Sequence, residues 1–230
     1  MKKQLLLITL LVTNLAYAQV TPRNFLAKAF SKEMVQQALI SQKDYAPYPK
    51  TREAWMAIMP AKEQAELIQR AERILKAPIP IMDASLLMEY VRSGDREEHG
   101  KVSFGKRNNL MELVMAETLE DKGRFTEKIM NYVWNICEET YWGVPAHLSV
   151  QKARSGMPDV EDPTVDLFGA ETAAGLALTD YFVGPKLDKI SKLLRQRIYY
   201  EVNKKILIPI LDQKRYGWLS TKNAVNNWNP

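Results

Sequence analysis

The chain has 230 residues, of which 46% are hydrophobic, 26% charged and 9% aromatic, a balance that excludes a disordered tail or a collagen-like chain. Its formal net charge is +5, but Lys and Arg are scattered rather than gathered in one stripe, so nucleic-acid binding is not favoured. A single Cys excludes an internal disulfide framework, two His limit an imidazole metal site to a partial ligand set, and no apolar run reaches the length of a membrane span.

The first residues carry the features of a secretory signal peptide in the usual order. Two Lys follow Met1, an apolar stretch occupies residues 5–12, and Ala-Tyr-Ala at residues 16–18 supplies the small side chains that signal peptidase requires. We therefore expect a signal peptide at residues 1–18, cleaved before Gln19, and a mature protein in the periplasm or outside the cell. The alternative for this segment is an N-terminal core helix.

The remaining sequence has the apolar spacing of α-helices, and no convincing run of alternating strand residues interrupts it. The predicted helices span residues 61–76, 84–93, 110–121, 124–139 and 166–182, and a last one runs from Leu187 towards Pro209. Gly94, Gly123 and the pair Gly184-Pro185 are expected to end helices. We expect an all-α protein of paired helices, in which residues 110–121 and 124–139 form one antiparallel hairpin.

The segment from Glu138 to His147, Glu-Glu-Thr-Tyr-Trp-Gly-Val-Pro-Ala-His, is the richest in groups that could bind a ligand. Aromatic rings, acids and a His at a helix end are typical of a sugar-binding cleft, because aromatic faces stack on sugar rings and polar groups hold the hydroxyls. The candidate residues are Glu138, Tyr141, Trp142 and His147. The alternative is structural: Tyr141 and Trp142 pack beneath the loop, and His147 caps a carbonyl.

The second candidate segment is residues 216–230. Tyr216, Trp218 and Trp228 supply aromatic platforms there, and Asn226 and Asn227 place amide donors and acceptors beside the last Trp. A turn rich in Asn is the structural alternative.

At these segments the chain resembles the heparinase II/III-like family of polysaccharide lyases. The matching stretches are residues 138–147, residues 166–180 (Asp-Leu-Phe-Gly-Ala-Glu-Thr-Ala-Ala-Gly-Leu-Ala-Leu-Thr-Asp) and residues 226–230 (Asn-Asn-Trp-Asn-Pro). The resemblance implies a partial α/α toroid at residues 19–230, built from helical hairpins, without the β-sandwich domain that follows the toroid in family members. It also implies a truncated gene product, or the front fragment of a split lyase.

Family lyases cut acidic polysaccharides by β-elimination, in which a base removes the C5 proton of a uronic acid and an acid protonates the leaving oxygen at C4. The resemblance implies that Asn226 or Asn227 neutralises the uronate carboxylate and that His147 assists as base or binder. The family Tyr that acts as acid and base is not reached in this sequence, so weak binding and little or no turnover are expected. The implied partner is an acidic polysaccharide, with no cofactor and no metal.

Other functions stay open from the sequence. One is a helical glycan-binding or scaffold protein without chemistry. Another is a glycoside hydrolase on the same ring, which needs two carboxylates across a cleft, with Glu138 and Asp166 as candidates. An interrupted ring also predicts an exposed apolar helical face and self-association through it. We expect His99 to be solvated in a polar loop and Cys137 to lie in the core.

Overall fold

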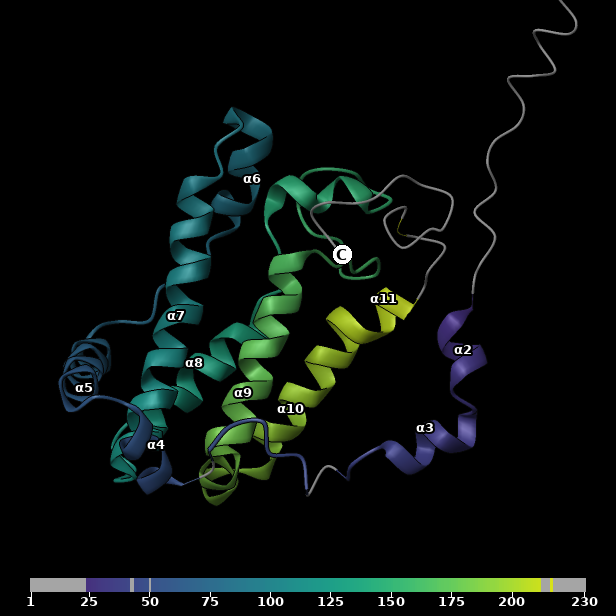
Figure 1. Ribbon diagram of the computed structural model, residues 1–230. Helices are drawn as coiled ribbons and strands as arrows, with labels where there is room; N and C mark the ends of the chain where they lie inside the picture. Colours follow the sequence, from purple (N-terminus) through teal and green to yellow (C-terminus); the bar gives the residue numbers. More distant parts are fainter. Residues whose placement is uncertain (1–23, 42–43, 50, 212–215, 217–230) are drawn as a thin grey trace, which may run out of the picture.

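The computed structural model describes residues 24–41, 44–49, 51–211 and 216, and every regular element within them is helical (Figure 1). The elements are α2 (Phe25–Ala29), α3 (Lys32–Ala38), α4 (Arg52–Ile58), α5 (Ala61–Lys76), α6 (Ala84–Ser93), α7 (Glu97–Glu120), α8 (Thr126–Glu138), the 3-10 helix η1 (Pro145–Val150), α9 (Leu167–Ile190), α10 (Lys192–Val202), the π-helix η2 (Asn203–Leu207) and α11 (Ile208–Leu211). The expected all-α class is confirmed. Among the described residues, no helix combines the length and the apolar character needed to cross a membrane.

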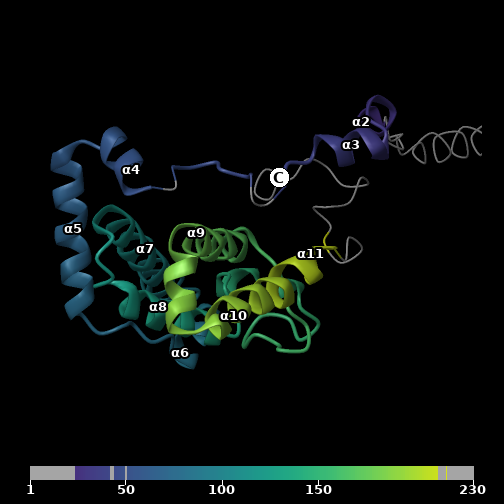
Figure 2. The same ribbon diagram turned by 90° about the horizontal axis from the view of Figure 1, so that it is seen from below.

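Helix α7 is central to the packing, because it contacts α5, α8 and α9, and α9 in turn contacts α10 (Figure 2). The α7–α8 hairpin is antiparallel, as predicted: Glu117 accepts from Phe125 N at one end, and Asn109 donates to the Tyr132 hydroxyl further along. Its core residues recur at helical spacing and are almost fully buried: Leu110, Leu113, Val114, Ile129, Val133 and Ile136. The Cys137 side chain lies in the same core, as expected.

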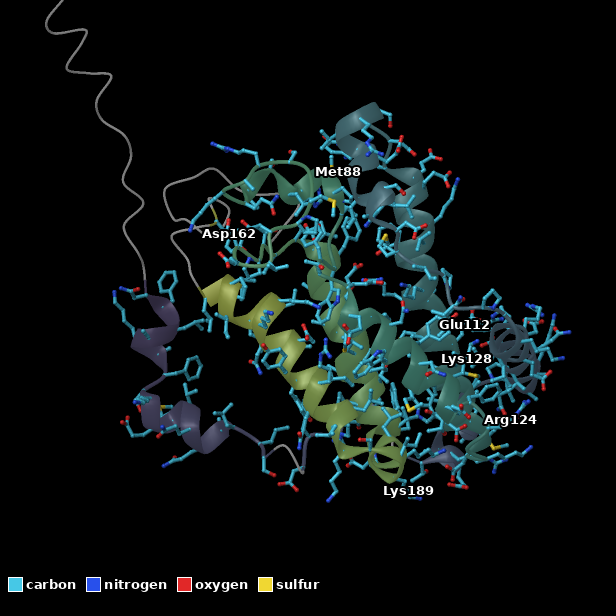
Figure 3. The ribbon with its side chains drawn as sticks, turned by 180° about the vertical axis from the view of Figure 1, so that it is seen from behind. Met88, Glu112, Arg124, Lys128, Asp162 and Lys189 are labelled. Atoms are coloured by element: carbon cyan, nitrogen blue, oxygen red, sulfur yellow. The ribbon has the colours of Figure 1, made fainter. Side chains whose placement is uncertain are left out.

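Polar contacts at the rim hold α5 against this hairpin. Arg70 Nε lies 2.9 Å from Glu112 Oε1, and Arg124 Nη2 lies 2.9 Å from Glu72 Oε1. Figure 3 shows Glu112, Arg124 and Lys128 on the side of the molecule that faces α5. Because these ion pairs are partly exposed, we expect them to orient α5 and to contribute little to the stability of the fold.

Helix α7 begins earlier than the sequence indicated. It starts at Glu97 and includes two glycines. Glu97 and Glu98 lie in its first turn, where carboxylates interact favourably with the helix dipole. His99 therefore lies inside a helix and is only 3% exposed. The expectation of a solvated His99 in a polar loop was wrong, because the tertiary packing of this turn outweighs its polar composition.

Helix α9 also runs further than predicted, since it continues through Gly184 and Pro185 to Ile190. Arg195 of α10 explains how the break is avoided. Its guanidinium pairs with Asp180 and lies 2.6 Å from Asp188 Oδ2, so it joins carboxylates on both sides of Pro185. Gly184 leaves the space that this guanidinium occupies, because a Cβ there would lie 2.9 Å from Arg195 Nε.

The carbonyls at the C-terminal end of α8 are hydrogen-bonded by side chains from two other segments. Trp142 Nε1 donates to the Ile136 carbonyl over 2.8 Å, and Lys205 Nζ donates to the carbonyls of Cys137 and Glu139. These donors satisfy carbonyls that a helix end otherwise leaves without partners. Burial lowers the pKa of the Lys205 ammonium, and its contacts with carbonyls and carboxylate keep the buried donor satisfied.

The residue directly after α8, Glu139, is the centre of a buried ion cluster. The Glu139 carboxylate, 7% exposed, pairs with Lys106 Nζ at 2.7 Å and with the Arg107 guanidinium, and Lys106 also donates to Asn135 Oδ1. Because Lys106 and Arg107 belong to α7, this one carboxylate joins the middle of α7 to the end of α8.

Replacing Glu139 with Gln tests this joint. The substitution should lower the free energy of unfolding by about 3 kcal/mol, because it leaves the buried Lys106 ammonium without its counter-charge. Urea denaturation provides the measurement. The control is Glu66→Gln, which breaks an exposed pair with Lys62 inside α5 and should change stability by less than about 0.5 kcal/mol. Equal small losses for the two variants would show that the cluster is not needed for stability.

Candidate functional site

Asp166 organises the loop that contains His147. It is the N-cap of α9, where its Oδ1 accepts from Gly169 N over 2.8 Å. Its Oδ2 accepts from Val144 N over 3.0 Å and lies 2.8 Å from His147 Nδ1. A single carboxylate, 5% exposed, therefore caps one helix and fixes the start of η1.

This contact determines which nitrogen of His147 is available. An ionised carboxylate only accepts hydrogen bonds, so we assign the proton to Nδ1 and the free lone pair to Nε2. The His147 side chain is 38% exposed, so solvent reaches it. The His–Asp pair thus has the arrangement in which a carboxylate orients an imidazole base and stabilises its protonated form.

Aromatic rings connect His147 to a pocket. The His147 ring stacks on Phe168 with centroids 6.1 Å apart and 14° between the planes, and Phe168 lies 5.0 Å from Phe104. Phe168 belongs to the first turn of α9 and Phe104 to α7, so the two helices each contribute one ring to the rim.

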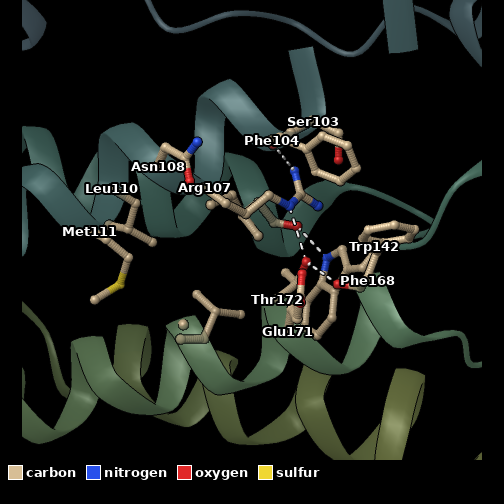
Figure 4. Close-up of a pocket in the computed structure, with 13 residues that line it drawn as sticks. Ser103, Phe104, Arg107, Asn108, Leu110, Met111, Trp142, Phe168, Glu171 and Thr172 are labelled. Atoms are coloured by element: carbon tan, nitrogen blue, oxygen red, sulfur yellow. Dashed lines mark hydrogen bonds between the residues drawn. The ribbon is translucent and has the colours of Figure 1, made fainter. Parts of the chain in front are cut away.

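The pocket between α7 and α9, called the α7–α9 pocket below, has a volume of about 380 Å³. Figure 4 shows the rings of Phe104, Trp142 and Phe168 at one end and Met111 at the other. Its lining is mainly apolar: Phe104, Leu110, Met111, Ile136, Trp142, Phe168, Gly175 and Leu176, with Ser103, Arg107, Asn108, Glu171 and Thr172 as the polar members. The size and the aromatic lining suit a small ligand or one unit of a longer one.

Arg107 places a charge on the wall of this pocket. Its Nε donates to Thr172 Oγ1 over 3.1 Å, its Nη1 donates to the Ser103 carbonyl, and it pairs with Glu139 through both terminal nitrogens. The guanidinium is therefore held rigidly, and its charge is balanced by a carboxylate that is already in place.

The predicted residues of the first segment have different positions. Trp142 is 2% exposed and contributes to the pocket wall, and Tyr141 is 9% exposed. Glu138 lies on the surface, where its carboxylate is 3.0 Å from Arg197 Nη1. The structure brings His147 and Trp142 to the same end of the α7–α9 pocket through Phe168, while Glu138 points elsewhere into an ion pair.

Of the second segment, only Tyr216 lies among the described residues. It is 1% exposed, and its hydroxyl accepts a hydrogen bond from Val165 N over 2.9 Å. Tyr216 therefore supports the end of the loop that precedes α9. Trp218, Asn226, Asn227 and Trp228 lie outside the described residues.

Sequence reasoning missed Phe104, Phe168 and Arg107, and it gave Asp166 only the role of a hydrolase carboxylate at the start of a predicted helix. The contact with His147 had no local signal, because it joins positions 19 residues apart through a loop. Phe104 and Arg107 were missed because the turn that holds them was placed outside the helix.

His99 adds a second imidazole to this region. Its Nδ1 is buried and has no hydrogen-bond partner within the described part of the chain. Burial, together with the nearby Arg107 charge, lowers the pKa of the His99 imidazole, while the Glu139 and Asp166 carboxylates oppose the shift. His99 is therefore neutral near pH 7. In the described ranges, no group of three or more His, Cys, Asp or Glu side chains is arranged to hold a metal ion.

No family model matches this sequence, and no curated protein matches it either.

Gly143 tests how closely the loop must approach Asp166. A Cβ at this position would overlap the Tyr141 hydroxyl and the Asp166 carboxylate, so Gly143→Ala should destabilise the protein by about 2 kcal/mol and displace His147. Thermal unfolding and the chemical shifts of the His147 ring give the two readouts. The control is Gly105→Ala in α7, where a Cβ meets nothing within 4 Å and should stabilise the helix by about 0.5–1 kcal/mol. A Gly143→Ala variant as stable as the wild type would contradict the close approach.

The lowered pKa of His99 predicts a loss of stability in acid. In the unfolded chain His99 binds a proton near pH 6.5, whereas in the folded chain it binds a proton only at lower pH. The free energy of unfolding should therefore be highest above pH 6.5 and should decrease as the pH falls below that value. Urea denaturation between pH 5 and pH 7.5 should show a smaller pH dependence for His99→Leu, by up to about 1.4 kcal/mol per pH unit. Identical pH profiles for the variant and the wild type would contradict this assignment.

Proposed function

We propose that this chain is part of an exported polysaccharide lyase, similar to the heparinase II/III-like enzymes, which cleaves uronic-acid-containing glycans by β-elimination. The observation that carries the proposal is the His147–Asp166 pair beside the α7–α9 pocket. The signal-like N-terminus supports export, and the helical hairpins α7–α8 and α9–α10 support an arc of an α/α toroid.

His147 is the proposed base. β-Elimination needs a group that removes the C5 proton of a uronate, and Nε2 of His147 has the free lone pair while Nδ1 is held by Asp166. When Nε2 takes the proton, the Asp166 carboxylate stabilises the resulting imidazolium. Asp166 thus orients the base and compensates its charge without contacting the substrate.

The surroundings of His147 suit a sugar chain. Phe104 and Phe168 offer aromatic surface at the rim of the α7–α9 pocket, on which the apolar face of a sugar ring can stack. In this proposal Asn226 or Asn227 hydrogen-bonds the uronate carboxylate and thereby makes the C5 proton easier to remove.

Exchange of the C5 proton tests the base directly, because it needs no leaving-group acid. The chain is incubated with a uronic-acid-containing polysaccharide in D₂O, and NMR follows the loss of the H5 signal together with any unsaturated product. We expect exchange with the wild type and a loss of at least about 100-fold in its rate for His147→Ala. The control is Val150→Ala, an exposed position in the same 3-10 helix, which should keep the wild-type rate.

Each result decides the proposal. Exchange that depends on His147 supports it, with or without unsaturated product. Binding of the polysaccharide without exchange would overturn it in favour of a glycan-binding protein without chemistry. Hydrolysis that yields only saturated ends would overturn it in favour of a glycoside hydrolase.

A further inference from the structure

Helices α2 and α3 form an arm that has no core of its own. Every residue from 24 to 41 is exposed, and neither helix contains a buried residue. The exposed large apolar side chains include Leu26, Phe30, Met34, Val35, Leu39 and Ile40, with exposed fractions between 48% and 76%. An apolar surface of this extent on a soluble chain marks an interaction site.

The arm is amphipathic in the way of a docking helix. In α3, Met34 and Val35 fall on one side, next to the C-cap residue Leu39, whereas Gln36 and Gln37 fall on the other side. The Ser31 side chain caps the helix by accepting from Met34 N, so a local contact defines the start of α3.

The chain is anchored shortly after the arm. The Tyr48 ring lies 5.8 Å from Phe182 and 6.3 Å from Tyr181, and the Tyr181 hydroxyl donates to the Tyr48 carbonyl over 2.8 Å. Figures 1 and 2 show α2 and α3 standing apart from the helical body beyond this point. The anchor therefore sets the direction in which the arm leaves the body.

A second exposed apolar surface runs along α10, η2 and α11, and we call it the α10–α11 stripe. Its members are Leu193, Tyr200, Leu207, Ile208 and Leu211, with exposed fractions between 47% and 75%. Leu193 and Tyr200 are two helical turns apart, which places them along one side of α10, and Leu207, Ile208 and Leu211 continue the exposed surface through η2 and α11.

We propose that the arm of one copy of this chain docks on the α10–α11 stripe of a second copy, and that the exchange is reciprocal. The stripe extends over about 28 Å of helix, enough for the two short helices of the arm. Reciprocal docking would cover about twenty large apolar side chains, which at ~80 Å² each gives ~1,600 Å², the size of a stable interface. This inference is independent of the proposed lyase function.

A second copy fits the observations better than the chain's own stripe. The arm already stands clear of its own body, so a partner can take it in the conformation that it has. Figures 1 and 2 show the arm apart from its own α10–α11 stripe, so docking on that stripe would require the arm to move. Exchange of a terminal element between identical chains is also a common route to symmetric dimers.

Light scattering on the full chain gives the first test. We expect twice the mass of a single chain for the wild type, and a dimer dissociation constant raised by at least about tenfold for Met34→Asp with Leu39→Asp. Gln36→Asp with Gln37→Asp is the matched control, because it adds the same two charges to the opposite side of α3 and should leave the dimer intact. Circular dichroism checks that both variants keep the fold. A monomeric wild type, or equal effects of the two double variants, would overturn the proposal.

Cross-linking distinguishes exchange from docking within one chain. A chain with Met34→Cys is mixed with a chain carrying Leu207→Cys, and a short bismaleimide is added. The natural Cys137 should not react, because it is buried and burial raises the pKa of its thiol to about 12. A cross-linked dimer of the two different chains supports the proposal. As a comparison, one chain carries both substitutions. The proposal would be overturned if this chain cross-links only within itself, or if neither sample cross-links.

Discussion

The Glu139 carboxylate is the contact on which the arrangement of the helices depends. It is buried at the point where α8 ends, and its two cationic partners come from consecutive residues of α7. Burying three charged groups is costly unless each is paired, so this cluster strongly restricts how α7 and α8 can sit relative to one another. It also fixes the first residue of the segment that leads to the candidate site.

Between Glu139 and His147, a series of specific contacts fixes the path of the chain. The Trp142 indole returns to the end of α8, Gly143 passes close to Asp166, and Asp166 holds both Val144 N and the His147 ring. The position of the imidazole therefore depends on a helix cap and a buried ion cluster rather than on the exposed surface of the loop. An imidazole held in this way would need little reorganisation to act as the proposed base.

Much of the fold could be predicted from apolar spacing, as the bounds of α5 and α6 and the α7–α8 hairpin show. The errors have physical causes that local patterns do not contain. Arg195 bridges the glycine and proline that should have ended α9, and packing around His99 extends α7 through a polar turn. Likewise His147 and Trp142 were evident as candidates from composition, whereas the partner Asp166 and the rings of Phe104 and Phe168 become neighbours only through tertiary structure.

The π-helix η2 has a consequence for how α10 supports this region. Lys205 and Ile206 are adjacent within this wider turn, and both side chains face the body. Lys205 reaches the end of α8, while Ile206 lies against Gly169 at the start of α9. Through these two side chains the irregular turn contacts both the end of α8 and the start of α9, the two helix ends that the loop with His147 connects.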